Sequence, residues 1–125
     1  MIFLKKCYLN TTEKVDVLSL LHDIRYAIRD ARIDDGLITL LLPKAGAGFV
    51  VSASDAQSSL HKRREETLPR TMTLPFATKD LLLAPKEEVF CIDFESKMGR
   101  REMIFQVMGE AKPEKTEAPK TGGRR

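Results

Sequence analysis

Residues 36–51 restrict the possible folds of this chain more than any other segment. Two apolar runs of strand length, 37–42 and 49–52, flank a turn segment, 43–48, that holds two glycines. Glycine adopts the positive φ angles that tight turns require. Both runs are almost continuously apolar, which is typical of strands that are buried on both faces. The segment therefore predicts a β-hairpin at the protein core or at a subunit interface.

Residues 13–33 have the periodicity of an amphipathic helix. Their apolar side chains recur at steps of three and four residues and form one stripe: Val17, Leu20, Leu21, Ile24, Ala27, Ile28 and Ala31. Such a stripe buries one face of a helix against a core. Thr12 is a suitable N-cap, because its side-chain oxygen can accept a hydrogen bond from the first turn. The segment predicts one N-terminal helix.

The remaining apolar segments predict strands. Strand-like runs occupy residues 2–9, 71–76, 81–83 leading into 89–94, and 102–108. Residues 54–66 leave a short helix and a loop as alternatives, because small and polar residues give way there to a charged run that ends before a proline. One early helix followed by strands predicts an α+β fold, in which an N-terminal amphipathic helix packs on a mainly antiparallel or mixed β-sheet or sandwich.

The net charge of the chain is concentrated at its C-terminus. The chain has 21 Lys and Arg residues against 18 Asp and Glu residues, and residues 111–125 hold 5 of the basic and 2 of the acidic ones. Residues 1–110 therefore carry 16 of each and are neutral. We predict one domain over 1–110 and a flexible basic tail over 111–125, which has no large apolar residue to offset its ordering entropy. A neutral body gives no reason to expect nucleic acid or an anionic membrane as a partner.

The cysteines and the apolar runs bear on the cellular compartment. Cys7 and Cys91 are the only cysteines, and both lie in apolar, strand-like surroundings. We expect buried free thiols in a reducing compartment. A disulfide between the two cysteines stays an alternative, because the sequence does not give the distance between their Cα atoms. No apolar run approaches the ~20 residues that span a bilayer, and residues 2–4 are too short for a signal-peptide core. The sequence predicts a cytoplasmic protein.

Four segments together resemble one known family. The turn 43–48 stands where that family has Pro-His-Thr-Ser-Ala-Gly, and residues 71–76 (Thr-Met-Thr-Leu-Pro-Phe) are similar to its Ser-Leu-Thr-Leu-Pro-Val. Residues 81–95 follow the family pattern without a gap, and residues 100–110 resemble its closing strand, which begins Arg-Arg and ends Gln-Val-Leu-Gly-Glu. The segments are similar to those of the YjbQ-like family, the secondary thiamine-phosphate synthase group. The resemblance covers about half of the chain and implies a shortened, divergent member with a YjbQ-like fold that assembles as a homotrimer.

The chain departs from this family at the positions that carry its chemistry. Lys44 stands where the family has a histidine, and Ala53 where it has a glutamate, while residues 84–88 replace the family turn Gly-Thr-Trp-Gln-Gly. A histidine and a carboxylate supply what a metal site or a general acid–base pair needs, whereas a protonated lysine has no lone pair for a metal. We therefore expect the inherited catalytic site to be lost, and we assign no catalytic residue, no metal ligand and no cofactor.

Three functions follow as hypotheses. The first is a divergent YjbQ-like protein that has lost catalysis and acts as an oligomeric binding or assembly module. The alternative is an enzyme, thiamine-phosphate-synthase-like, with a rebuilt cleft that binds a phosphorylated small molecule through Lys44, Gly46, Gly48 and Lys86. In it, backbone N–H groups at the glycines and the charges of the lysines would hold the phosphate. The third is weak nucleic-acid binding through the basic tail. A non-enzymatic role is favoured, and neither nucleic acid nor a membrane is expected as a partner.

Overall fold

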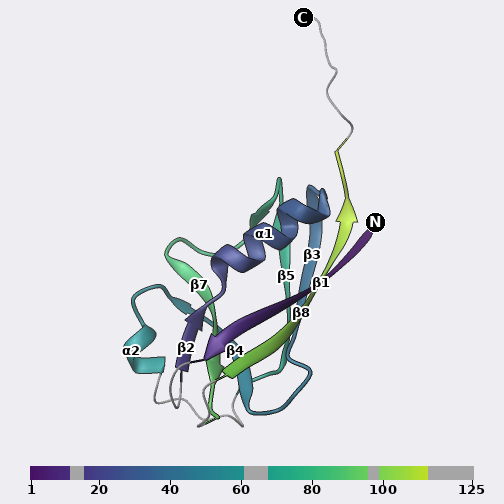
Figure 1. The fold of residues 1–125 in the computed structure, drawn as a ribbon. Coiled ribbons are helices and arrows are strands. Elements are labelled where there is room, and N and C mark those ends of the chain that lie inside the picture. Colours follow the sequence, from purple (N-terminus) through teal and green to yellow (C-terminus); the bar gives the residue numbers. More distant parts are fainter. Residues whose placement is uncertain (12–15, 61–67, 96–98, 113–125) are drawn as a thin grey trace, which may run out of the picture.

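The computed structural model describes residues 1–11, 16–60, 68–95 and 99–112, which form two β-sheets and two helices (Figure 1). The larger sheet has the strand order β1 (Ile2–Thr11), β8 (Gly99–Glu110), β3 (Asp35–Leu41), β5 (Thr71–Ala77) and β6 (Asp80–Leu81). The smaller sheet has the order β2 (Asp16–Ser19), β7 (Glu87–Asp93) and β4 (Ala47–Ala53). The helices are α1 (Leu21–Ala31) and α2 (Gln57–Leu60). All strand pairs within the described ranges are antiparallel.

The predicted α+β fold with an N-terminal helix over residues 13–33 is wrong. The described part of the chain is β-rich, and its longer helix, α1, begins only at Leu21, after two strands. Residues 16–19 form β2, which pairs with β7, and Val17 is buried beside Phe90. Val17 fits the helical spacing of apolar residues, but it is buried through strand pairing instead. Tertiary contacts here override a weak local preference for helix.

The two strands of the predicted hairpin do not pair with each other. β3 lies in the larger sheet between β8 and β5, whereas β4 lies in the smaller sheet beside β7. The turn between them therefore carries the chain from one sheet to the other. Both strands still supply the core, since Ile38, Leu40 and Phe49 are fully buried in one cluster.

Helix α1 covers the inner side of the sheets, where it contacts β1, β7 and β8 (Figure 1). Its buried residues are Ile24, Ala27, Ile28 and Ala31. The helix ends at Arg32, which has a left-handed conformation (φ 58°) and donates its N–H to the carbonyl oxygen of Arg29 at 3.1 Å. At the other end Leu20 stands at the N-cap without a side-chain hydrogen bond, and the predicted cap Thr12 lies outside the described residues.

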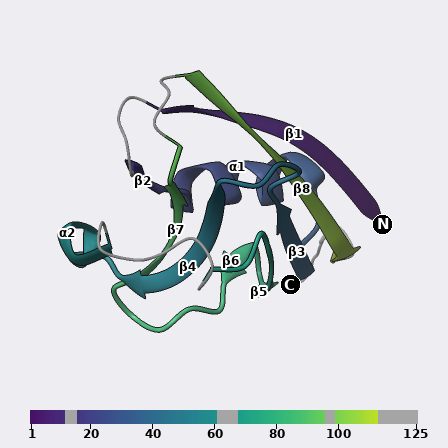
Figure 2. The same ribbon diagram turned by 90° about the horizontal axis from the view of Figure 1, so that it is seen from below.

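Alternation along the strands of the larger sheet separates an inner face from an outer face. Odd-numbered residues of β1 and β8 face α1, as the ion pair between Lys5 Nζ and Asp30 Oδ2 at 2.7 Å shows, and they include the buried Met103 and Phe105. Even-numbered residues of the same strands point to the opposite, outer face. Seen from below, the long strands β1 and β8 run together along one side of the molecule (Figure 2).

Two further predictions concern segments that lie partly outside the described residues. Of residues 54–66, for which a short helix and a loop were alternatives, 57–60 form α2, while 61–66 lie outside the described residues. Of the predicted tail, only residues 111 and 112 are described. Within the described ranges no helix is long and apolar enough to cross a membrane.

Candidate functional site

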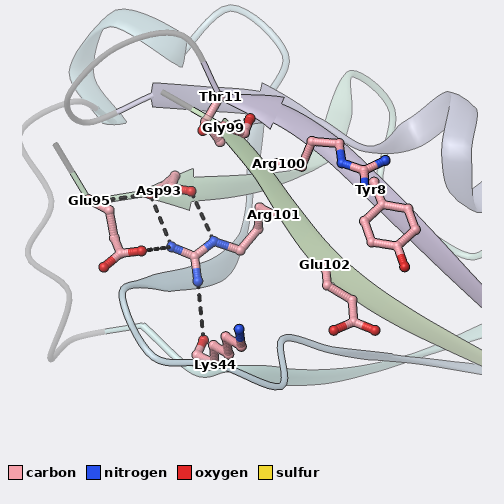
Figure 3. A pocket seen from close by; sticks show the side chains of 9 residues that line it. All are labelled: Tyr8, Thr11, Lys44, Asp93, Glu95, Gly99, Arg100, Arg101 and Glu102. Carbon is pink, nitrogen blue, oxygen red and sulfur yellow. Dashed lines mark hydrogen bonds and ion pairs between the residues drawn. The ribbon is translucent and has the colours of Figure 1, made fainter. Parts of the chain in front are cut away.

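A pocket of about 350 Å³ opens at one end of the larger sheet. The end of β1, the start of β8, the end of β7 and the turn between β3 and β4 build it (Figure 3). Its lining holds three cationic side chains, Lys44, Arg100 and Arg101, and three carboxylates, Asp93, Glu95 and Glu102, together with Tyr8, Thr11 and Gly99. Because the formal charges cancel, the pairing among them decides which charge a ligand would meet.

The guanidinium of Arg101 is a buried part of this pocket. Arg101 is 6% exposed and Asp93 is 3% exposed, and two bonds join them, Nε to Oδ2 at 2.9 Å and Nη2 to Oδ1 at 3.2 Å (Figure 3). Nη2 also donates to Oε1 of Glu95 at 3.1 Å. Bidentate pairing of this kind is the strongest form of an arginine–carboxylate contact. Burial lowers the pKa of Arg101, but the hydrogen bond and charge of Asp93 and the charge of Glu95 act against burial, and the net pKa is raised.

Arg101 also fixes the turn between β3 and β4. Its Nη1 donates to the carbonyl oxygens of Ala45 at 2.9 Å and of Lys44 at 3.4 Å. The N–H of Phe94 donates to the carbonyl oxygen of Gly46 at 2.8 Å, which ties the same turn to the end of β7. All five N–H groups of the guanidinium thus have protein acceptors. Arg101 therefore holds the site together and has no donor left for a ligand.

The other two cations of the pocket have no such partners among the described residues. The ammonium of Lys44 and the guanidinium of Arg100 make no ion pair or side-chain hydrogen bond with the described residues. Arg100 instead lies over the ring of Tyr8, 4.5 Å from its centroid (Figure 3). Glu102 is paired with Lys6, whose Nζ lies 3.6 Å from Oε2. Arg101 offsets one of its two carboxylate partners and Lys6 offsets Glu102, so with Lys44 and Arg100 the charge among the described residues of the pocket is positive by one.

The structure does not bring the four sequence-predicted ligand residues together. Lys44 lines the pocket, and Gly46 lies in the turn beside it with φ 101°. Gly48 is buried inside β4, where a Cβ would lie 2.5 Å from the Cβ of Leu68. Lys86 lies beyond the far end of β4, since its carbonyl oxygen accepts the N–H of Ser54 at 2.7 Å. The length of β4, about 20 Å for seven residues, therefore separates Lys86 from Lys44.

Sequence reasoning missed Tyr8, Arg100 and the pair Arg101–Asp93. One signal was present in the sequence: Asp93 is the single charged residue within the apolar run 89–94. A buried carboxylate needs a cation, and Arg101 has the same strand parity as the buried Met103 and Phe105. That these two residues face each other depends on the path of β7 and β8, which the sequence does not state.

The chemistry available at the pocket is charge-based. The described residues hold no group of three or more His, Cys, Asp or Glu side chains that could bind a metal ion. Cys91, close to Asp93 in β7, is a free buried thiol, and burial followed by the charge of Asp93 raises its pKa to about 12. Such a thiol is neutral near pH 7 and is a poor nucleophile. Cys7 is also free and half-buried.

The whole fold is similar to several solved structures at low sequence identity. A YbjQ-like protein of unknown function from Sulfolobus solfataricus is 12% identical, with a TM-score of 0.75 over 88% of this chain and 99% of that chain. An uncharacterized conserved protein of the yjbq/upf0047 family from Clostridium acetobutylicum is 11% identical, with a TM-score of 0.70 over 83% and 99%. A conserved hypothetical protein from Thermus thermophilus is 15% identical, with a TM-score of 0.70 over 83% and 99%.

No protein-family model matches the sequence, and no curated protein matches it closely enough to count as a relative. The identities to the solved structures lie far below the level at which sequence shows common activity, so the likeness concerns the path of the backbone. That path agrees with the resemblance seen in the strand and turn segments of the sequence. The chain has the YjbQ-like fold.

Proposed function

We propose that this protein is a homo-oligomeric assembly and binding module, whose copies meet through the outer face of the larger sheet. The observation that carries the proposal is a group of large apolar side chains on that face, arranged in two rows with Gln106 and Thr39 between them. Its members come from three adjacent strands: Ile2 and Leu4 of β1, Ile104 and Met108 of β8, and Leu37 and Leu41 of β3. We call this set the outer apolar face.

Strand register aligns these side chains in rows across the sheet. Ile2 is opposite Met108, and Met108 is opposite Leu37, and all three are exposed. Ile104 is opposite Leu41 in a second row, where both are half-buried. Exposed large apolar residues are common when scattered, but a contiguous patch marks an interaction site. Covering the outer apolar face by another copy would remove this surface from water.

The edge of the sheet supports the same proposal. β1 has ten residues and is the outermost strand, and no described strand pairs with its free edge. Long exposed edges tend to pair with other chains unless they are covered. A homotrimer is the assembly that the resemblance to the YjbQ-like family implies, and a cytoplasmic location suits two free thiols.

The molar mass in solution tests the assembly. We expect a multiple of the 14.1 kDa chain mass by light scattering after size exclusion, and three copies specifically. Leu4→Lys places a charge in the outer apolar face and should release monomers. Leu82→Lys is the matched control, because Leu82 is 62% exposed and Leu4 is 60% exposed, but Leu82 lies outside the face. A wild-type protein that stays monomeric at all concentrations would contradict the proposal.

A second candidate function is the binding of a phosphorylated small molecule in the pocket at Lys44. The specific observation is that Lys44 and Arg100 form no ion pair with a described residue, while each carboxylate of the pocket already contacts another cation. An arginine guanidinium and a lysine ammonium are the usual protein partners of phosphate. An enzymatic step, as the thiamine-phosphate-synthase-like alternative requires, would come in addition to this binding.

Ligand-induced stabilisation tests this second function. Inorganic phosphate or thiamine monophosphate at ten times its dissociation constant should stabilise the protein by about 1.4 kcal/mol, a rise of several degrees in melting temperature. Lys44→Ala should abolish the rise. Lys86→Ala should keep it, because Lys86 lies at the far end of β4. Equal losses in both variants, or no rise with either ligand, would exclude the pocket as the site.

A further inference from the structure

The exposed side of α1 is divided into an acidic flank and a basic flank. Asp30 points toward β1 and pairs with Lys5. Arg25, Arg29 and Arg32 follow one another at steps of four and three residues, which places them on one side of the helix and its C-terminal end. All three are exposed, and none makes an ion pair with a described residue. The neutral total charge of the body thus hides a row of unpaired cations.

An aromatic side chain stands beside this row, next to Arg29. Tyr26 is 57% exposed, although a tyrosine ring usually buries much of its surface. The guanidinium carbon of Arg29 lies 5.7 Å from the centroid of the ring. An exposed ring beside cations is the combination on which unpaired bases stack while their phosphates are neutralised.

A hollow of about 470 Å³ lies next to the basic flank. Arg25 and Lys86 line it and bring two cations that no described residue pairs. Leu81, Leu83 and Pro85 give it apolar walls. Its carboxylates, Asp80, Glu87 and Glu88, outnumber its cations and would repel an acidic peptide or a phosphate inside the hollow, but they can accept hydrogen bonds from the amino group of a base. Glu87 and Glu88 are already oriented by the N–H of Ala84 and the hydroxyl of Ser19.

We propose that the basic flank of α1, with Tyr26 and the adjoining hollow, binds single-stranded nucleic acid. Arg25, Arg29 and Arg32 extend over about 10 Å of helix, which is room for two to three successive phosphates. Tyr26 offers a stacking surface, and the hollow accepts an unstacked base. A base that is paired within a duplex has its edge occupied and cannot enter the hollow, so single strands are preferred.

This surface is independent of the proposed assembly. α1 packs on the inner face of the larger sheet, whereas the outer apolar face lies on the opposite side (Figure 1). The basic flank therefore stays accessible in an oligomer that forms through the outer apolar face. Several copies of the flank in one assembly would also raise the apparent affinity for a long strand.

Fluorescence anisotropy with a labelled twelve-residue oligocytidine, whose bases carry amino groups, a matched duplex and the full-length chain tests the proposal. We expect binding to the single strand with a slope of log K against log salt of about −1.4 to −2.1, since each of two to three neutralised phosphates contributes about −0.7. Arg29→Gln should reduce the magnitude of the slope by about 0.7 and weaken binding several-fold. Arg70→Gln is the charge-matched control, because Arg70 is also exposed and unpaired among the described residues, and it should change little.

Two further variants separate stacking and the tail from the basic flank. Tyr26→Ala should weaken binding at least 5-fold while Tyr26→Phe keeps it, because stacking needs the ring and not the hydroxyl. Deletion of residues 113–125 should leave the effects of Arg29→Gln and Tyr26→Ala in place. Binding that is abolished by the deletion, equal affinity for duplex and single strand, or no binding at low salt would each overturn the proposal.

Discussion

Arg101 links four parts of the chain through one buried guanidinium. It joins the start of β8 to Asp93 in β7, to Glu95 beyond that strand, and to the turn between β3 and β4. A buried ion pair adds little stability compared with an apolar pair of the same shape. Removing one partner of the ion pair, however, leaves the other charge buried without compensation. In this protein, Arg101 matters because it fixes the conformation of the turn which carries Lys44.

Replacement of Arg101 should therefore cost more than the loss of an exposed ion pair. We expect Arg101→Ala to lower the free energy of unfolding by about 3–5 kcal/mol, because Asp93 then keeps a buried, unpaired charge. Lys5→Ala removes the exposed pair with Asp30 and should cost at most about 1 kcal/mol. Urea denaturation of both variants measures the difference, and similar losses in the two would show that Asp93 is solvated.

The thiol of Cys91 gives the folded state a dependence on alkaline pH. Its pKa is raised to about 12 in the folded protein by burial and by Asp93, from an ordinary value of 9.0. A group with a raised folded pKa contributes its full stability below the unfolded pKa and loses it as pH rises toward the folded pKa. Stability should therefore fall between pH 9 and 12 by up to about 1.4 kcal/mol per pH unit from this group. Cys91→Ala should show a shallower decline in the same denaturation series.

Among the elements, the turn between β3 and β4 depends on a single backbone conformation. Gly46 has φ 101°, and a Cβ there would lie 2.7 Å from the side chain of Glu95 and 3.1 Å from Nη2 of Arg101. We expect Gly46→Ala to cost about 1–3 kcal/mol, because it combines backbone strain with a clash at the buried guanidinium. Gly99→Ala is the control, since nothing lies within 4 Å of a Cβ there, and it should stay within about 0.5 kcal/mol of wild type. Equal melting temperatures of the two variants would contradict this role of Gly46.

The elements that the sequence predicts correctly are those with a strong local pattern. The strand runs at 2–9, 71–76 and 102–108 fall within β1, β5 and β8, because alternating burial is recorded in their side chains. Residues 16–19 were misassigned to a helix because the buried positions of β2 and the first buried positions of α1 happen to fit one helical stripe. Only the pairing of β2 with β7 distinguishes the two, and this pairing spans more than seventy residues of chain.

The candidate site was harder to predict than the strands, because it depends on which strands are neighbours. Lys44 was found, since the turn that carries it is visible in the sequence. The sequence groups Lys86 and Gly48 with Lys44 by residue type. In the structure, the length of β4 separates Lys86 from the pocket, and Gly48 is buried inside β4. Arg100 and Tyr8 meet only because β1 pairs with β8 across almost the whole length of the chain. Long-range pairing of this kind leaves no local mark.

For the whole molecule, total charge and average hydropathy conceal how the surface is divided. The outer apolar face and the arginine row of α1 lie on opposite sides of the larger sheet. The order of inner and outer residues along β1 produces this division, because it directs Lys5 toward α1 and Leu4 away from it. The alternation along β1 therefore distinguishes the side that would meet another copy from the side that would stay free.

The end of the domain can be located by two truncations. The N–H of Lys112 donates to Oδ2 of Asp34 at 2.6 Å, and its Nζ donates to Oγ1 of Thr78 at 3.0 Å. The hydrogen bond from Lys112, followed by that from Lys79, lowers the pKa of Asp34 below its ordinary value of 3.8. Lys112, two residues beyond the boundary at 110 that composition predicts, is thus hydrogen-bonded to Asp34 and Thr78.

We expect deletion of 113–125 to leave the melting temperature at pH 7 unchanged and deletion of 111–125 to lower it. A carboxylate with a lowered folded pKa contributes stability above its unfolded pKa and loses it as pH falls through the folded value. The difference between the two truncations should therefore shrink as the pH is lowered below 3.8 in the same calorimetric scans. If deletion of 113–125 already lowers the melting temperature at pH 7, the tail belongs to the folded domain, and the boundary lies further along the chain.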